Sequence, residues 1–262
     1  MGALQYTSNV RVEGTLENPL IAKFGRFVTL AAADRTMINH VTSERIRDFA
    51  AREDVIREGD TPQHINLILS GWACRYKVLE DGRRQVIAFF LPGDLCDLNV
   101  FVLQAMDHSI GAITALTVSE ISRPGFDALM RAHVRIPTAL WWEQLVAAAV
   151  QREWAVNLGQ RDATERVAHL FCELFRRLEV VGLVNGDTCE MPVTQSDLAE
   201  ATGLSPVHIN RTLQELRRLG VIVLKDRTLT IPNFEALAQI AMFNPNYLHL
   251  EHEGRHLDAN AV

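Results

Sequence analysis

Four side chains with the chemistry to read base pairs fall on one face of a helix expected from Pro206 to Leu219. Arg211 can donate two hydrogen bonds to guanine O6 and N7, and Asn210 and Gln214 can pair with adenine N6 and N7. Val207 is short and apolar, so it can pack on a thymine methyl group. At 100° per residue the opposite face is apolar. That face consists of Ile209, Thr212, Leu213, Leu216 and Leu219. The helix is therefore expected to bury one face and to offer the other to a DNA major groove.

Other polar residues around this helix are expected to meet phosphates, which fix the register of a protein on DNA without reading its sequence. They are Ser205 and His208 at the start of the helix, Arg217 and Arg218 near its end, and Lys225 and Arg227 beyond it. A solvated helix face or turn is the alternative for each of these residues and for the four base-reading candidates.

The segment over residues 194–220 has the pattern of two short helices that cross, a helix-turn-helix. Thr194 with Asp197 three residues later is a capping signature for the first helix. Gly203 stands where the turn needs a positive φ, which glycine adopts at little cost. Ser205, followed by a proline, is typical of the start of the second helix. These signals agree at the required spacing, which an ordinary helical hairpin would not explain.

Two apolar, alternating runs follow over residues 221–232 and flank the tripeptide Lys225-Asp226-Arg227. Such runs around a short polar turn predict a β-hairpin. Placed directly after a helix-turn-helix, this hairpin would form a wing.

Composition is compatible with two small domains that bury real cores, because the chain has 262 residues and 48% of them are hydrophobic. The formal net charge is −6, but residues 205–227 carry five Lys or Arg against two acids. A local positive patch on an acidic protein favours DNA binding at that patch alone. No run approaches the length of a transmembrane helix and no signal-peptide pattern is present, so a cytoplasmic protein without a membrane partner is expected.

The four cysteines, Cys74, Cys96, Cys172 and Cys189, are widely spaced and form no CxxC pair. This argues against a zinc module or a tightly spaced iron–sulfur loop, and each is expected to be a small buried side chain. A redox role for Cys96 stays open. The histidines His249, His252 and His256 share a helical spacing, but a frayed polar tail is favoured over a metal site.

Glycines recur every eleven or twelve residues from Gly59 to Gly93, with apolar or alternating runs between them. Alternation with regular turn signals predicts an antiparallel β-roll. Strands are expected at 65–69, 73–79, 85–91, 109–116 and 118–123, and a helix is expected to run from Thr42 or Ser43 through Phe49. Together with the helices that follow, this predicts an α+β fold.

A long helix is expected over residues 137–159, with more apolar surface than one small domain covers. We expect it to pair with a second copy of the chain, which would suit two DNA half-sites. The residues expected at the dimer interface are Leu140, Trp141, Leu145, Ala148 and Ala155. The alternative is a helix packed wholly on its own β-roll. Asp162 with Glu165 is a capping signature that starts a new helix, so a hinge is expected just before it.

The order of these elements divides the chain into five expected parts. They are a flexible N-terminus over residues 1–18, a β-roll sensor domain over 19–135, a dimerisation helix over 136–160, a winged helix-turn-helix domain over 161–243 and a C-terminal tail over 244–262.

This order, with the motifs LPGDLCDLNVF, NLGQRDATERVAHLF and TQSDLAEATGLSPVHINRTLQELRRLGVI, resembles the Crp/Fnr superfamily of bacterial transcription regulators. The resemblance covers about residues 20–235. It implies a homodimer that binds a palindromic operator in double-stranded DNA and contacts RNA polymerase. It also implies an effector pocket in the β-roll, at positions that correspond to Asp97, Leu98, His108, Ser109, Gln151 and Arg152.

Departures from the family pattern bear on the effector. Cyclic-AMP binders use a glutamate for the ribose and an Arg-Ser pair for the phosphate, whereas this chain has Asp97 nearby and His108-Ser109. A phosphodiester needs a fixed cation, and histidine is a weak, pH-dependent substitute. Cyclic AMP is therefore not expected. No cysteine precedes Cys74, so an iron–sulfur cluster of the Fnr type is not expected either. Haem is not excluded, since His64, His108 and Met106 are ligands by type.

Two other classes of function are alternatives to a DNA-binding regulator. One is a small-molecule sensor whose β-roll binds a nucleotide or haem and controls the DNA-binding state. The other is a cupin-like enzyme, which would need clustered histidines and a glutamate around a metal. The roll has only scattered histidines, and no nucleophile–base pair or phosphate loop is present, so no catalytic residues are expected.

Overall fold

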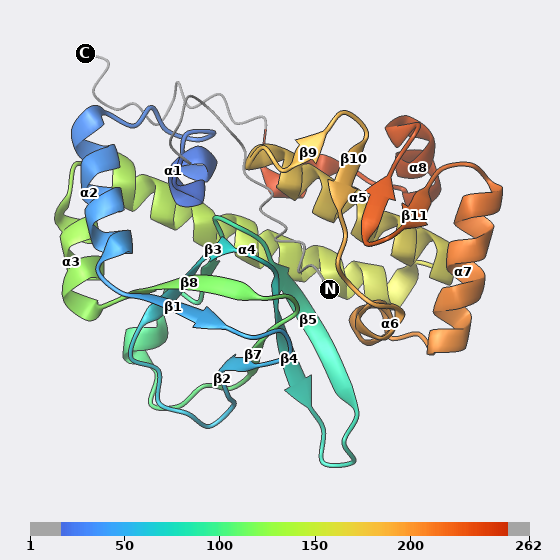
Figure 1. Cartoon of the computed structure of the whole chain (residues 1–262), viewed down its shortest axis with the longest axis horizontal. Helices are drawn as coiled ribbons and strands as arrows, with labels where there is room; N and C mark the ends of the chain where they lie inside the picture. Colours follow the sequence, from blue (N-terminus) through green and yellow to red (C-terminus); the bar gives the residue numbers. More distant parts are fainter. Residues whose placement is uncertain (1–16, 251–262) are drawn as a thin grey trace, which may run out of the picture.

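The computed structural model describes residues 17–250, which form a β-roll, one long helix and a helical C-terminal part (Figure 1). The α-helices are α1 (Pro19–Phe24), α2 (Ala32–Ser43), α3 (Arg123–Arg131), α4 (Arg135–Gln160), α5 (Ala163–Val180), α6 (Gln195–Thr202), α7 (Pro206–Arg218) and α8 (Phe234–Ala241). Two short 3₁₀ helices are η1 (Val100–Val102) and η2 (Pro245–Leu248). The expected tail residues His252 and His256 lie outside the described residues.

The β-roll consists of two antiparallel four-stranded sheets with the orders β1-β8-β3-β6 and β2-β7-β4-β5. Its strands are β1 (Ile46–Phe49), β2 (Asp54–Ile56), β3 (Ile65–Ser70), β4 (Ala73–Val78), β5 (Arg84–Phe90), β6 (Leu95–Cys96), β7 (Ser109–Ala112) and β8 (Leu116–Ile121). The expected turn glycines adopt positive φ. At Gly71 (φ +82°) a Cβ atom would lie 2.2 Å from the carbonyl oxygen of Ala115, so no side chain fits there.

The helix expected from Thr42 or Ser43 through Phe49 is wrong. α2 ends at Ser43, and β1 follows it and pairs with β8 in the register Ile46↔Ser119. Three residues of β1 are exposed and Phe49 is buried with Ile68, because β1 is an edge strand that turns one side chain into the roll. Thr42 and Ser43 are the last two residues of α2, so no helix starts at the expected cap.

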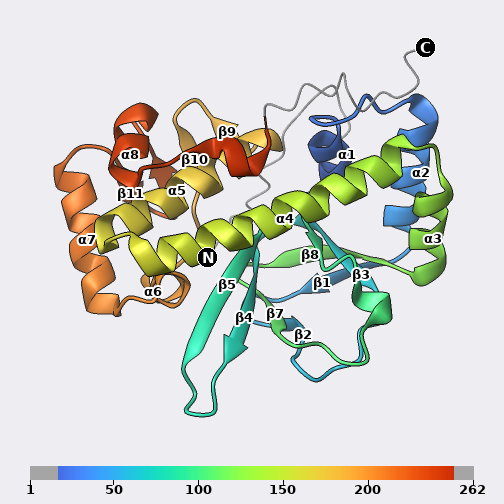
Figure 2. The same ribbon diagram turned by 180° about the vertical axis from the view of Figure 1, so that it is seen from behind.

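Helix α4 crosses the roll and reaches the C-terminal part, as Figure 2 shows from behind. Its buried side packs Ile136, Ala139, Leu140 and Trp142 against the roll and α1, and Trp154 against α5. Leu140 was expected at a dimer interface, but its side chain is buried inside the chain. The boundary between the buried and the exposed face of α4 therefore falls between two adjacent residues, Leu140 and Trp141.

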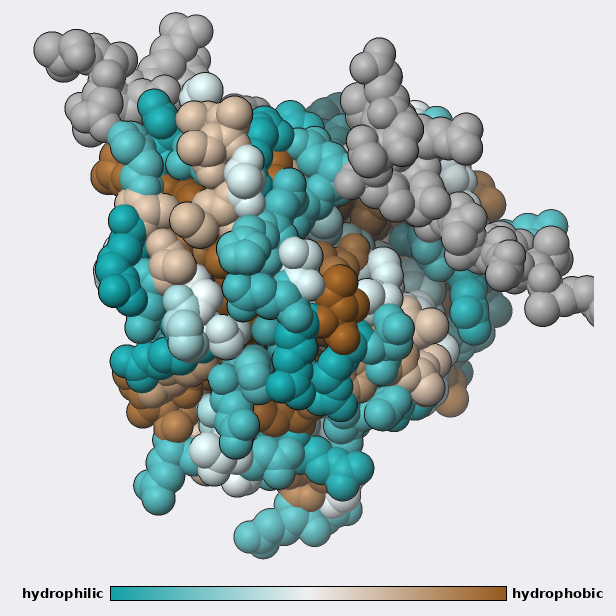
Figure 3. All heavy atoms as spheres, turned by 60° about the vertical axis from the view of Figure 1, so that its left-hand side comes forward, coloured by the Kyte–Doolittle hydropathy of each residue, from teal (hydrophilic) through white to brown (hydrophobic). Residues whose placement is uncertain are grey.

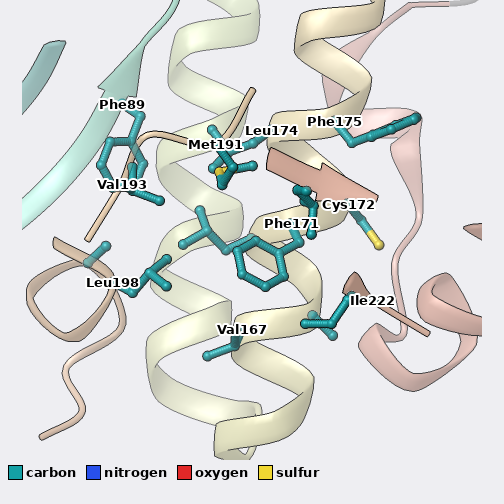
Figure 4. Packing of buried hydrophobic residues seen from close by; sticks show 14 of the residues in the cluster. Phe89, Val167, Phe171, Cys172, Leu174, Phe175, Met191, Val193, Leu198 and Ile222 are labelled. Carbon is teal, nitrogen blue, oxygen red and sulfur yellow. The ribbon is translucent and has the colours of Figure 1, made fainter. Parts of the chain in front are cut away.

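The C-terminal part packs around α5, whose capping box at Asp162 and Glu165 is confirmed. A third four-stranded sheet, in the order β11-β12-β10-β9, lies beside it. Its strands are β9 (Val184–Asn185), β10 (Thr188–Glu190), β11 (Val223–Lys225) and β12 (Thr228–Thr230). The β11–β12 hairpin is the expected wing, whereas β9 and β10 were not expected. Figure 4 shows Phe171 of α5 between Leu198 of α6 and Ile222 before the wing, and Leu174 of α5 beside Met191.

The expected α+β class, with a roll followed by helices and a winged helix-turn-helix, is confirmed. On the face in Figure 3, hydrophilic residues predominate and the hydrophobic ones form separate patches. Within residues 17–250, no helix has the length and hydropathy needed to cross a membrane.

Candidate nucleic-acid interface and interdomain cavity

The predicted caps and turn of the helix-turn-helix are confirmed. The Thr194 hydroxyl accepts a hydrogen bond from the Asp197 amide at 3.1 Å, and the Asp197 carboxylate accepts one from the Thr194 amide at 2.8 Å. Gly203 ends α6 with φ +66°. The Ser205 hydroxyl accepts from the His208 amide at 3.2 Å and so starts α7. These local bonds satisfy helix-end donors and fix the crossing of α6 and α7.

The buried face of α7 contains Ile209, Thr212, Leu213 and Leu216, as expected. Leu219 differs, because 46% of it is exposed. The helix ends at Arg218, so Leu219 is its C-cap and lies beyond the last buried turn. Val221 and Ile222 fill the core at that point instead.

The opposite face of α7 is open to solvent. Val207 is 65% exposed, Arg211 and Gln214 are exposed, and Asn210 is half-buried. The Gln214 amide donates to the Asn210 side-chain oxygen at 3.0 Å, which links two of the candidate base-reading groups. Within the described part of the chain, Arg211 has no recorded hydrogen bond or ion pair. It lines a polar hollow of about 280 Å³ with Ser205, Val207 and His208.

The candidate phosphate contacts fall into two groups. Arg218, Lys225 and Arg227 are exposed, and the last two stand at the tip of the wing. Arg217 is also exposed, but it donates to the Leu224 carbonyl oxygen at 3.0 Å and so holds the wing against α7. Thr164, at the start of α5, reaches the same hollow as Arg211 and was missed, because its place depends on how α5 packs on α7.

A cavity of about 270 Å³ lies between the roll, α4 and the C-terminal part. Of the six residues expected in an effector pocket, Asp97 and Gln151 line it. The Gln151 side chain donates to the Ile87 carbonyl oxygen at 2.9 Å. Asp97 also contacts the Nε2 atom of His108 at 2.9 Å.

The other four expected pocket residues lie elsewhere. His108 is buried behind Asp97, and its Nδ1 atom contacts Asp107 at 2.7 Å. The Ser109 hydroxyl accepts from the Glu58 amide. Leu98 packs in the hydrophobic core, and Arg152 is exposed on the outer face of α4.

Charged residues on the cavity wall are joined in ion pairs that sequence reasoning missed. Lys23 of α1 lies 2.7 Å from Asp94 and 2.5 Å from Glu143 of α4. Arg177 of α5 lies 2.7 Å from the second oxygen of Asp94. Burial alone raises the pKa of Asp94, but Lys23 and Arg177 outweigh it and hold that pKa below its usual range. The partners are as far as 120 residues apart in the chain, so no local pattern could have revealed them.

The four cysteines are buried and unpaired. Burial raises the pKa of Cys172 and that of Cys189 to about 12, and it raises the pKa of Cys96 well above its usual range. A thiol in such surroundings is inert, which favours the structural interpretation of Cys96 over a redox role. Of the residues named as haem ligands by type, Met106 is buried in the core and His108 is engaged by two carboxylates.

Comparison with known proteins agrees with this geometry. The family model described as a cyclic nucleotide-binding domain matches residues 46–133, and the one described as a Crp-like helix-turn-helix domain matches residues 165–240. The chain is 29% identical to the transcriptional activator protein FnrL of Cereibacter sphaeroides, over 74% of this chain and 79% of that protein. It is 25% identical to the fumarate and nitrate reduction regulatory protein of Escherichia coli, over 76% and 79% of the two chains.

A solved structure has the same fold. The structure of FixK2 from Bradyrhizobium japonicum matches with a TM-score of 0.67 and 24% identity, and the match covers 75% of this chain and 96% of that one. A sensor roll followed by a winged helix-turn-helix defines a transcription regulator. Within that class, the chain belongs to the Crp/Fnr family, which confirms the resemblance seen in the sequence.

Proposed function

We propose that the chain binds an inverted-repeat operator as a homodimer, with α7 of each copy in a major groove. The observation that carries this proposal is the open face of α7, where Arg211 has no recorded partner within residues 17–250 and lies beside Val207. Asn210, Arg211, Gln214 and Val207 would contact base edges, because their chemistry matches those edges. Arg218, Lys225, Arg227, Ser205 and His208 would contact phosphates. Arg217 would do so only in addition to its bond to the wing.

The outer face of α4 supports the dimer. We call this surface the free face; it consists of Trp141, Leu145, Ala148, Arg152 and Ala155. Trp141 is 71% exposed and Leu145 is 48% exposed. Their spacing of four and three residues repeats along the helix, as in a two-stranded coiled coil. Leu140 is not part of the proposed interface, since it packs inside the chain.

The position of α7 suits this pairing. Figures 1 and 2 place α7 at the end of the molecule, beyond the C-terminal end of α4. Two α4 helices that pair in parallel would therefore bring both copies of α7 to the same end of the dimer. Both could then enter one DNA duplex, in half-sites about one helical turn apart.

In this proposal residues 19–135 sense a signal, residues 136–160 dimerise and residues 161–243 bind DNA in the cytoplasm. The interdomain cavity, with Asp97 and Gln151, would hold the effector. Contact with RNA polymerase is proposed from the family alone. Relatives named as activators or as regulators of nitrogen fixation and of fumarate and nitrate reduction support a role in transcription rather than in catalysis.

The proposal is tested by selecting DNA from a random duplex pool with the purified full chain, in air and without added ligand. Enrichment of an inverted repeat, lost in an Arg211→Ala variant that still folds and dimerises, would support it. Enrichment of a single, non-repeated site by a monomer would contradict it. If nothing is enriched under several buffer and redox conditions, including cyclic nucleotides and haem, the assignment of α7 as a reading helix would be wrong.

A further inference from the structure

The interdomain cavity has walls from both functional parts of the chain. The roll and α4 contribute one side, including Phe90 and Val146. The other side comes from the end of α5 and from η2 with the residues just after it, through Val181, Leu248 and Leu250. A ligand in this cavity would touch the sensor roll and the DNA-binding part at the same time.

The charges on this wall are already balanced. Its three basic residues are Lys23, Arg75 and Arg177, and its three acidic residues are Asp94, Asp97 and Glu143. Each cation is paired with a carboxylate of the same wall. The Lys23–Asp94 and Arg177–Asp94 distances are both 2.7 Å, and Arg75 pairs with Asp97. An anionic ligand would therefore have to break an existing pair to find a counter-ion, and breaking a buried pair is costly.

One further polar atom argues against an anion. The Oε2 atom of Glu143 is buried without a hydrogen-bond partner. Burial raises the pKa of Glu143 above its usual range. A second negative charge placed nearby would raise the free-energy cost of the charged form of this carboxyl group further.

Apart from Gln144 and Gln151, the rest of the lining is apolar, and it includes Phe27, Phe89, Trp142 and Val150. The volume of about 270 Å³ lies just below the usual range of small-molecule sites, which is roughly 300–1,000 Å³. A compact ligand with an apolar body would bury most of its surface there.

We propose that the interdomain cavity binds an uncharged, largely apolar small molecule no larger than a three-ring aromatic compound, held between the roll and the end of α5. The inference rests on the proposed function, because it names the class of effector for a regulator of this architecture. A ligand that touches both the roll and the DNA-binding part can stabilise one arrangement of the two parts over another. It would thereby change the DNA-binding state.

Two dyes that differ in charge test the class of ligand. N-phenyl-1-naphthylamine is neutral, and 1-anilinonaphthalene-8-sulfonate has the same two aromatic parts with an added sulfonate. The full chain should bind the neutral dye saturably, with a rise in fluorescence, and at least about tenfold more tightly than the sulfonate. Equal or tighter binding of the sulfonate would overturn the proposal.

Cavity-filling variants test the place. Val181→Phe and Leu250→Trp should each weaken binding of the neutral dye by at least about tenfold. Val78→Phe is the matched control at an exposed valine on the roll, away from the cavity, and should leave binding unchanged. Circular dichroism and thermal unfolding identify variants that fold, and two cavity positions are used so that one misfolded variant does not decide the result. Unchanged binding in the folded cavity variants would overturn the proposal.

The same samples are assayed for binding to the selected operator. If the chain binds the operator but fails the dye tests, the proposed function is supported and this inference is wrong. If the chain passes the dye tests but binds no operator, the ligand site is supported and the proposed function is wrong.

Discussion

Arg52, in the loop between β1 and β2, donates from both terminal nitrogens to the two carboxylate oxygens of Asp197 in α6, at 2.6 and 2.8 Å. The two residues are 145 positions apart in the chain. One helical turn further on, Arg84 of β5 pairs with Glu200 of α6. The roll is thus joined by ion pairs to the first helix of the helix-turn-helix, and the sensor side of the molecule holds the DNA-binding side directly.

Removing the Arg52 side chain should weaken the contact between the roll and α6. Arg52→Ala leaves the capping box of Thr194 and Asp197 in place, so it isolates the interdomain bond. Because half of the Arg52 side chain is exposed, the free energy of unfolding should fall by only about 1 kcal/mol. Urea denaturation measures the change, and Arg52→Lys, which keeps the charge but loses the paired geometry, should recover part of it. No change in either variant would show that the pair does not hold the domains.

The same pair predicts a dependence on pH. Burial alone raises the pKa of Asp197, but the bonds from Arg52 and Thr194 outweigh it and hold that pKa below its usual range. A carboxyl whose folded pKa is lowered stabilises the fold above its unfolded pKa, about 3.9, and this contribution is lost as the pH falls through the folded pKa. The stability difference between wild type and Arg52→Ala should therefore be constant near neutral pH and shrink below about pH 4. A difference that persists unchanged in acid would contradict this account.

Arg211 and Arg218 are expected to differ in what they do for DNA binding. Arg211→Ala should cost about 1–3 kcal/mol of binding free energy and relax the preference at one base position of each half-site. Arg218→Ala should weaken binding to all sequences alike and reduce the dependence of affinity on salt. Fluorescence anisotropy with single-base variants of the operator, at several salt concentrations, separates the two. Equal effects on base preference would show that Arg218, and not Arg211 alone, reads a base.

Pairing through the free face of α4 predicts that a charge at its centre breaks the dimer. Leu145→Glu should give a monomer in sedimentation velocity, because two buried carboxylates would face each other across the interface. Leu79→Glu is the matched control, since Leu79 at the roll hairpin is 50% exposed and Leu145 is 48% exposed. The control should remain dimeric. A dimer that survives Leu145→Glu would place the interface elsewhere.

The cysteines should be chemically silent in the native protein. Because burial raises the pKa of Cys172 and of Cys189 to about 12, almost no thiolate exists at pH 8. Ellman's reagent should therefore react with all four thiols only after the protein is unfolded. Rapid reaction of one thiol in the folded chain, assigned by mass spectrometry to Cys96, would restore a redox role for that residue.

Local signals predicted the helix-turn-helix well, because caps and turns depend on residues close in the chain. Thr194, Gly203 and Ser205 act within three or four residues of their partners. The prediction of which residues of a helix are buried or exposed failed where a helix ends or changes neighbours, as at Leu140 and Leu219.

The cavity could not be predicted, because its wall is assembled from distant segments. Lys23 meets Glu143 only after α1 packs against α4, and Arg177 meets Asp94 only after α5 reaches the roll. The family pattern pointed to six pocket positions, yet a side chain lines a cavity only if its neighbours leave space there. For Leu98 and Arg152 they do not, since one is in the core and the other is on the free face.

The most direct test of the account is the affinity of the full chain for its selected inverted repeat, compared with the same duplex in which one half-site is scrambled. Specific contacts from two copies of α7 predict a loss of at least about a hundredfold when one half-site is removed, with two chains bound per intact repeat. Equal affinity for the two duplexes would contradict the account, because it would mean that the chain does not read a repeated site through paired recognition helices.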